Sequence, residues 1–302
     1  MLPTATASTH VSEAFTPAVM HALEQLRLRA RSLSSARFQG SRKSRERGRS
    51  LDFTDYRHYV AGDDPRDLDW NAVARFDALL IRLFAAEVAL PLELVIDGSK
   101  SMAWPERGLT KITAALRAAA ALALIAARTE TPVHLASTGS LSIGLAAQSE
   151  FRQFLTQLDR LSATSMRPAT ETLRALASRG AGRTVVLFTD GYDIETLQPA
   201  LRGLRASGAE AAVILTLSPW ELAPELEGDL TLTDTESSGE LRVSADAHTL
   251  RHYRERLDAM LALWKRECRR TGSAYGLLMS DTPLDMTARG LLLESGLVRR
   301  RR

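Results

Sequence analysis

Short apolar runs alternate with amphipathic stretches over most of the chain after residue 91. Continuous apolar runs predict buried strands, which fall at 92–97, 184–190, 210–217 and 273–279. Apolar residues recurring every three to four positions predict helices at 109–128, 149–161, 170–178, 195–207, 246–271 and 284–294. Two hairpins are predicted, one joining 131–137 to 140–145 and one within 230–243. This alternation predicts an α/β fold with a doubly wound, mostly parallel sheet and helices on both faces.

The first part of the chain has a different pattern. Pro17 at a first helical turn, followed by leucines at 23, 26, 28 and 33, predicts a helix to about residue 34. A basic loop that contains glycine and serine then runs to about residue 50. We therefore expect an N-terminal extension over 1–84, a main domain over 85–296 and a basic tail over 297–302.

Composition is that of an ordinary globular protein, with 45% hydrophobic and 25% charged residues among 302. Cys268 is the single cysteine, so no internal disulfide can form, which suits a reducing compartment. The most apolar stretch, 118–127, is far shorter than the roughly 20 residues that span a bilayer. No charged segment leads into an apolar one at the N-terminus. We therefore expect neither a membrane span nor a signal peptide, and a cytoplasmic location.

The formal charge of +3 conceals an uneven distribution. Nine Lys or Arg and one acid lie between Arg27 and Arg49, and residues 299–302 are all Arg. The remainder holds 26 basic and 35 acidic residues. The basic segments could attract nucleic acid or an acidic partner. We favour a solvated face instead, because aromatic residues do not interleave the charges as they do in proteins that bind single strands.

The candidate chemistry lies where the first buried strand ends. The sequence Asp-Gly-Ser-Lys-Ser at 97–101 places a carboxylate and two hydroxyls at alternate positions. Asp190 ends a later buried strand, and Thr170 begins a helix. Ligands of parallel sheets gather at the carboxyl ends of the strands, and Mg²⁺ prefers hard oxygen ligands. These residues could therefore surround one ion, although Asp and Ser before a helix can also serve only as its N-cap.

This arrangement resembles the metal-ion-dependent adhesion site (MIDAS) of von Willebrand factor A-like (vWA) domains. The resemblance implies that Mg²⁺ or Mn²⁺ binds directly to Ser99, Ser101 and Thr170, while Asp97 and Asp190 hold metal-bound waters. Many vWA domains carry Gly-Gly-Thr at the third-ligand loop, whereas this chain has Pro-Ala-Thr at 168–170. Thr164 or Thr172 could then replace Thr170.

A second resemblance, to the DUF58 family, rests on a long block of unusual composition. Its pieces are Phe-Thr-Asp-Tyr-Arg-His-Tyr at 53–59, Ala-Gly-Asp-Asp-Pro-Arg at 61–66, Asp-Trp-Asn at 69–71, Ala-Arg at 74–75 and Thr-Pro-Leu-Asp at 282–285. The likeness spans about residues 35–296. It implies a non-enzymatic adaptor for a MoxR-type AAA+ ATPase in protein assembly or activation. The metal would then grip an Asp or Glu of a partner protein.

Other functions have weaker sequence support. A metal-dependent hydrolase is an alternative, but Ser99 stands where the second Asp of a haloacid-dehalogenase-type phosphatase would be, and no phosphate-binding loop is present. Nucleic-acid or acidic-partner binding through the basic segments is the other alternative. His248 and His252 have the spacing of zinc ligands but lack a third ligand. The aspartates at 63, 64, 67 and 69 could form a second metal site, but we favour an acidic turn paired with Arg57, Arg66 and Arg75.

Overall fold

The computed structural model describes the backbone of residues 10–29, 53–63, 65, 68–84, 90–104, 109–136, 143–161, 167–234, 237 and 239–301. Side chains are described over the same ranges except at 53–55 and 82–84. The chain forms two compact units. One unit consists of Met1–Arg29 with Leu90–Arg302, and the other consists of Ala30–Ala89. The described residues 10–29, which fall within the extension predicted over 1–84, belong to the first of these units.

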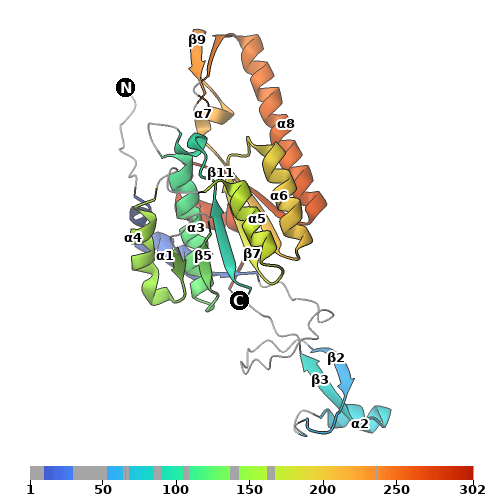
Figure 1. Cartoon of the computed structure of the whole chain (residues 1–302). Coiled ribbons are helices and arrows are strands. Elements are labelled where there is room, and N and C mark those ends of the chain that lie inside the picture. The colour runs from blue at the N-terminus through green and yellow to red at the C-terminus, as the bar shows by residue number, and fades with distance from the viewer. Residues whose placement is uncertain are drawn as a thin grey trace. The chain divides into compact units, whose positions relative to one another are not determined.

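A six-stranded sheet forms the centre of the main unit (Figure 1). Its strands are β4 (Leu92–Ile96), β5 (Val133–Leu135), β6 (Ile143–Leu145), β7 (Thr184–Thr189), β8 (Glu210–Leu217) and β11 (Ala274–Met279). They lie in the order β11-β8-β7-β4-β5-β6, and all neighbours are parallel except β5 and β6. The predicted mostly parallel sheet is confirmed, and β5 and β6 form the predicted hairpin, whose turn lies outside the described residues.

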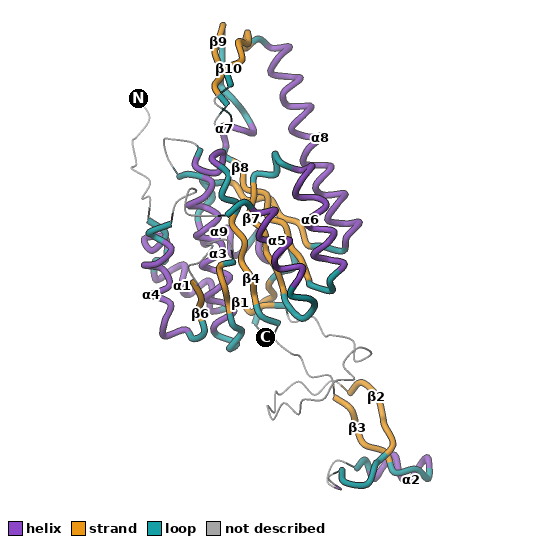
Figure 2. Tube along the Cα trace, viewed as in Figure 1, coloured by secondary structure: helices purple, strands orange, loops and turns teal. Residues whose placement is uncertain are grey.

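Helices cover both faces of this sheet (Figure 2). One face carries α1 (Pro17–Glu24), α3 (Lys111–Ala127), α4 (Phe151–Leu158), α9 (Leu284–Arg289) and α10 (Leu291–Glu294). The other face carries α5 (Ala169–Ser178), α6 (Ile194–Ala206) and α8 (Ala247–Thr271). In α3 every residue except Thr113 and Arg117 is buried, because its alanines let the helix lie close to the sheet. No helix in the described ranges is both long and apolar enough to cross a membrane.

The strand order places two loops side by side. From β4 the chain passes to β5 on one side, and it later returns to β7 on the other side of β4. The carboxyl ends of β4 and β7 are therefore adjacent at a reversal of strand order, which is where open α/β sheets bind ligands. Asp97 and Asp190 directly follow these two ends.

The two ends of the main unit pair with each other, which the sequence did not predict. The predicted helix from Pro17 to about residue 34 was too long, since α1 ends at Glu24 and β1 (Leu26–Leu28) follows. This strand pairs antiparallel with β12 (Val298–Arg300), which lies within the predicted basic tail. Leu26 and Val298 are buried in the core, so long-range packing prevails here over the local helical pattern.

A second hairpin follows the central strands. It consists of β9 (Gly228–Thr233) and β10 (Glu240–Ala245), and α7 (Pro219–Leu222) precedes it. The buried residues of the 25-residue helix α8 all lie at or beyond Leu257. Accordingly, the hairpin and the start of α8 extend past the end of the sheet in Figure 1. The short 3-10 helices are η1 (Ser12–Ala14), η4 (Lys100–Ala103) and η5 (Gln148–Glu150).

The smaller unit contains β2 (Phe53–His58), α2 (Trp70–Phe76) and β3 (Leu80–Phe84), with β2 and β3 antiparallel. Arg57 donates two hydrogen bonds to the Asp63 carboxylate, at 2.5 and 2.8 Å. Asp69 accepts from Tyr56 Oη at 2.8 Å and caps α2 through the amide of Asn71. The predicted acidic turn paired with Arg57 is confirmed for Asp63, whereas Asp64, Arg66 and Asp67 lie outside the described residues.

Candidate functional site

The loop after β4 brings two serine hydroxyls together. Ser101 Oγ donates to Ser99 Oγ at 3.1 Å, and the buried Met102 anchors η4 to the core. Ser99 stands at the N-cap of η4 but makes no side-chain capping bond. Simple helix capping, the structural alternative to a ligand role, therefore does not explain the Ser99 hydroxyl.

Asp97 is a buried carboxylate held by neutral donors. Its Oδ2 accepts from Thr189 Oγ1 at 2.6 Å, and its Oδ1 accepts from the Ser99 amide at 3.3 Å. Burial raises the pKa of Asp97 above its ordinary value, against the lowering effect of the Thr189 hydrogen bond, and the nearby Asp190 raises it further. Asp97 forms no salt bridge with any cation in the described part of the chain. A buried carboxylate of this kind favours a bound cation or proton.

Asp190 is positioned by a tight turn at the end of β7. Gly191 has φ of +81°, a conformation that favours glycine, and its carbonyl accepts from Trp264 Nε1 at 2.9 Å. A Cβ at Gly191 would lie 2.6 Å from that same nitrogen. The turn directs Asp190 Oδ1 toward the Tyr192 amide, 3.4 Å away. Packing against α8 therefore fixes the Asp190 side of the site.

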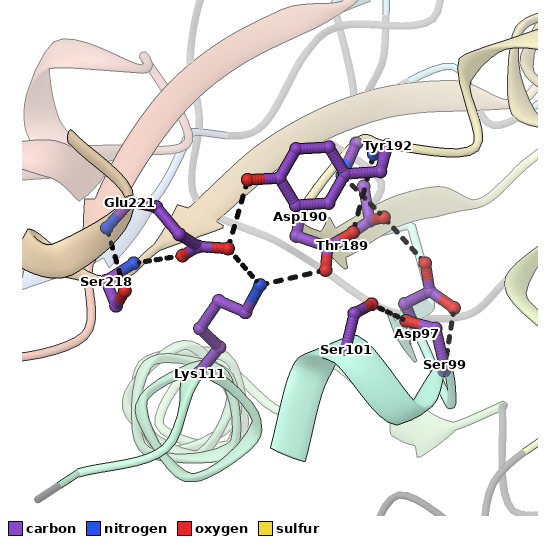
Figure 3. Close-up of polar contacts among 10 residues, drawn as sticks. Asp97, Ser99, Ser101, Lys111, Thr189, Asp190, Tyr192, Ser218 and Glu221 are labelled. Atoms are coloured by element: carbon purple, nitrogen blue, oxygen red, sulfur yellow. Dashed lines mark hydrogen bonds and ion pairs between the residues drawn. The ribbon is translucent and has the colours of Figure 1, made fainter. Parts of the chain in front are cut away.

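A buried lysine that the sequence analysis missed lies beside Asp190 (Figure 3). Lys111 Nζ is 2.9 Å from Asp190 Oδ2 and 2.6 Å from Glu221 Oε1. Its side chain is 1% exposed, and it begins α3 directly after the N-cap Thr110. The helix dipole disfavours a cation at a helix N-terminus. A lysine at the first position of this alanine-rich helix could therefore have indicated, from sequence, that it has an acidic partner.

Glu221 is held from several directions. Its Oε1 also accepts from Tyr192 Oη at 3.1 Å, and its Oε2 accepts from the Ser218 amide at 2.6 Å in a capping box. The Tyr192 ring centre lies 5.3 Å from Lys111 Nζ. Desolvation of its hydroxyl, with the adjacent Glu221 carboxylate, raises the pKa of Tyr192, so the phenol stays protonated and donates to Glu221. The structure thus adds Lys111, Tyr192 and Glu221 to the predicted residues.

The structure gathers four of the five predicted ligands at the ends of β4 and β7. Figure 3 shows Asp97, Ser99, Ser101 and Asp190 around one region. Thr170 Oγ1 lies 3.0 Å from Thr196 Oγ1 of α6. Of the alternative threonines, Thr172 Oγ1 donates to the Pro168 carbonyl at 3.3 Å, and Thr164 lies outside the described residues. The third hydroxyl ligand therefore stays a prediction.

The donor set fits a hard divalent cation. Neighbouring ligands of octahedral Mg²⁺ stand about 3.0 Å apart, given metal–oxygen distances of about 2.1 Å. The two serine oxygens are 3.1 Å apart, close to that spacing. No three His, Cys, Asp or Glu side chains converge as metal ligands in the described residues, so any site here depends on the hydroxyls. Such a site would hold the ion through Ser99 and Ser101, with Asp97 and Asp190 supplying the negative charge.

The fold and these residues define a class of protein: a mostly parallel α/β sheet with a polar site at the carboxyl edge of its central strands. The profile described as "Protein of unknown function DUF58" matches residues 55–260. The chain belongs to the DUF58 family. The match includes all five predicted ligands together with Lys111 and Glu221.

Similarity to other known proteins is low. No curated protein matches the chain. A solved aerotolerance-related membrane protein from Bacteroides fragilis NCTC 9343 is 14% identical, with a TM-score of 0.39, covering 68% of this chain and 98% of that one. The conserved hypothetical protein BatB from Bacteroides thetaiotaomicron is 13% identical, with a TM-score of 0.33, covering 61% and 98% respectively. Likeness at this level carries no functional argument.

Proposed function

We propose that this chain is a non-enzymatic, metal-dependent protein-interaction module of the vWA type. Its MIDAS-like site binds Mg²⁺ or Mn²⁺ and uses an open coordination position to grip an Asp or Glu of a partner. The observation that carries the proposal is the pairing of two serine oxygens 3.1 Å apart with the buried Asp97, which lacks a cationic partner among the described residues. Neutral hydroxyl ligands leave the ion electrophilic, which favours an added carboxylate.

The proposal also includes the identity of the partner protein and the location of this chain in the cell. The family resemblance favours a MoxR-type AAA+ ATPase as the partner, with this chain as its adaptor in the cytoplasm. Two exposed aromatic residues adjoin site residues: Tyr192 donates to Glu221, and Trp220 directly precedes Glu221 in the chain. Their exposed fractions are 47% and 46%. Aromatic residues next to a charged anchor are typical of protein-binding surfaces.

Calorimetric titration with MgCl₂ and MnCl₂ tests the metal site directly. We expect the unaltered protein to bind one ion, and Asp97→Ala or the double variant Ser99→Ala/Ser101→Ala to lose binding. Ser178→Ala is a matched control, because this exposed serine donates to the Ala175 carbonyl of its own helix. Normal binding by the double variant would show that the site assignment is wrong.

The open coordination position has its own test. Mn²⁺ with an exchangeable water enhances the relaxation of bulk water protons, and a carboxylate that replaces this water reduces the enhancement. We expect acetate or a glutamate-containing peptide to reduce it, while acetamide or the glutamine peptide leaves it unchanged. A relaxation enhancement that does not change when carboxylates are added would contradict coordination of a partner carboxylate to the metal.

One observation favours the second candidate function, binding of a polyanion. Arg27 lies opposite Arg299 in the β1–β12 pair, and Arg29 and Arg301 continue the same ladder. Strand alternation therefore places these four arginines on one face and directs Val298 and the leucines of β1 to the core. Four arginines on one face give it a positive potential, which attracts a polyanion.

Salt dependence distinguishes this function from the first. Polyanion binding predicts that affinity for a labelled oligonucleotide or polyglutamate falls steeply with salt and does not require Mg²⁺. The double variant Arg27→Ala/Arg299→Ala should then bind more weakly, while Arg251→Ala/Arg254→Ala on the exposed part of α8 should not. Equal binding by both double variants would remove this candidate.

A further inference from the structure

The candidate site already contains a cation of its own. The Lys111 ammonium is buried between Asp190 and Glu221, at 2.9 and 2.6 Å. Asp190 and Glu221 have side chains only 3% and 12% exposed, so solvent does little to stabilise their charges. Removing one member of such a buried group leaves the others without a partner, which is strongly destabilising.

The charges of the cluster are not balanced by Lys111 alone. Lys111 is shared between Asp190 and Glu221, and Asp190 also lies close enough to Asp97 to raise its pKa. Asp97 forms no salt bridge in the described ranges. Lys111 therefore leaves the Asp97 side of the cluster without a cation, which supports a site that holds both a lysine and a metal.

We infer that Lys111 is a tethered cation that competes with the divalent metal for Asp190, and that Glu221 retains Lys111 when the metal binds. This inference rests on the proposed metal site. The competition follows from geometry, because Lys111 contacts Asp190 Oδ2, while Oδ1 is turned toward the Tyr192 amide. An ion or metal-bound water that takes Oδ2 must share it with the ammonium or displace it.

Glu221 is suited to hold the displaced ammonium. Its carboxylate is fixed by Tyr192 Oη and by the Ser218 amide, so it does not depend on Lys111 for its position. Its backbone carbonyl accepts from Tyr253 Oη at 2.7 Å, which ties α7 to α8. Lys111 can therefore release Asp190 without leaving the buried cluster. We regard Lys111 and Glu221 as positioning residues that set the metal affinity.

The test is calorimetric titration of MgCl₂ and MnCl₂ into variants in which the two residues are changed separately. Lys111→Met removes the competing cation and keeps an unbranched side chain. We expect it to bind the metal about tenfold more tightly or better, because a full charge close to the ion is lost. Glu221→Gln leaves Lys111 bound to Asp190 alone, so we expect metal binding weaker by about tenfold.

Matched controls separate competition from a general change of charge. Lys265 and Glu225 are exposed and are not among the proposed site residues, so Lys265→Met and Glu225→Gln remove the same charges where solvent screens them. We expect the affinity of these controls to change less than twofold, roughly as screening predicts. Thermal unfolding adds a second measurement. Without metal, Lys111→Met should melt below the unaltered protein, and saturating Mg²⁺ should raise its melting temperature by more.

The outcomes distinguish the inference from the proposed function. Metal binding by the unaltered protein with unchanged or weaker affinity in Lys111→Met would overturn the competition, while leaving the metal site intact. Should Lys111→Met fail to fold, Glu221→Gln decides, since unchanged or tighter binding in that variant overturns the inference as well. Absence of metal binding in every form would overturn both the proposed function and this inference. Binding by Lys111→Met alone would support Lys111 as the competing cation.

Discussion

Thr189 donates a hydrogen bond of 2.6 Å to Asp97 and so connects the ends of β7 and β4 within the core. The same hydroxyl accepts from the Gly191 amide at 3.1 Å. One buried threonine thus fixes both the carboxylate of the first loop and the turn that carries Asp190. The two halves of the candidate site are positioned by this connection before any ligand binds.

Thr189→Val should weaken both stability and metal binding. The substitution preserves shape but leaves a buried carboxylate and an amide without their partner, so we expect a loss of about 1–3 kcal/mol in the free energy of unfolding. Metal affinity should fall by about tenfold, as for other partners of metal ligands. Urea denaturation and calorimetry measure these effects. Thr216→Val on β8 is the control, because the buried Thr216 hydroxyl has no hydrogen-bond partner among the described residues and its loss should be neutral or stabilising.

Gly191→Ala should displace the Asp190 turn. The positive φ and the contact of a Cβ with Trp264 Nε1 at 2.6 Å both oppose a side chain, and we expect about 2–3 kcal/mol of destabilisation. Gly203→Ala within α6 is the matched control. A Cβ there meets nothing within 4 Å, so the change should stabilise by about 0.5–1 kcal/mol. Equal melting temperatures for the two variants would contradict the strain at Gly191.

Glu267 should make a pH-dependent contribution to stability. Hydrogen bonds from Arg202, reinforced by Arg270 and Gln198, lower the pKa of this buried carboxyl to about 2. A lowered pKa gives stability that is present above the unfolded value of about 4.3 and lost as the pH falls toward about 2. We expect a contribution on the order of 2 kcal/mol, reduced by the exposure of both guanidinium groups.

Glu267→Gln therefore provides the comparison. At neutral pH it should lose this contribution, and between about pH 4.5 and 2 its stability should approach that of the unaltered protein. Urea denaturation across this range measures the difference. Glu255→Gln, at an exposed position of the same helix, should show no such convergence. A constant difference for Glu267→Gln at all pH values would show that the carboxylate charge is unimportant.

Asp97→Asn should stabilise the protein when metal is absent. Because burial is the main cause of the raised pKa of Asp97, its folded form binds a proton more readily than the unfolded chain. The associated stability is full below about pH 4 and is lost as the pH rises through the folded pKa. The uncharged variant avoids this loss, so its advantage should grow toward neutral pH. Saturating Mg²⁺ should reverse the order of melting temperatures, and an unchanged order would contradict a metal role for Asp97.

The sequence by itself determined the central sheet and the positions of two acids. The apolar runs that became β4, β7 and β8 are buried on both faces, and the run that became β11 forms the partly buried edge strand, so local composition was sufficient to predict these strands. Parallel strands bring their carboxyl ends to one edge, which is why Asp97 and Asp190 were expected together. The DUF58 block likewise depends only on consecutive residues.

Tertiary structure decided which distant segments pair and which side chains come together, because contacts between distant segments leave no periodic signal in the sequence. The β1–β12 pair joins residues near the two ends of the chain and shortens the helix predicted from Pro17. Lys111 and Glu221 are 110 positions apart, so the local sequence around either residue does not identify the other as its partner. Thr170 is a plausible ligand in sequence, yet the packing of α5 on α6 places its hydroxyl against Thr196. Local periodicity thus fixed the elements, and long-range packing fixed which side chains share the site.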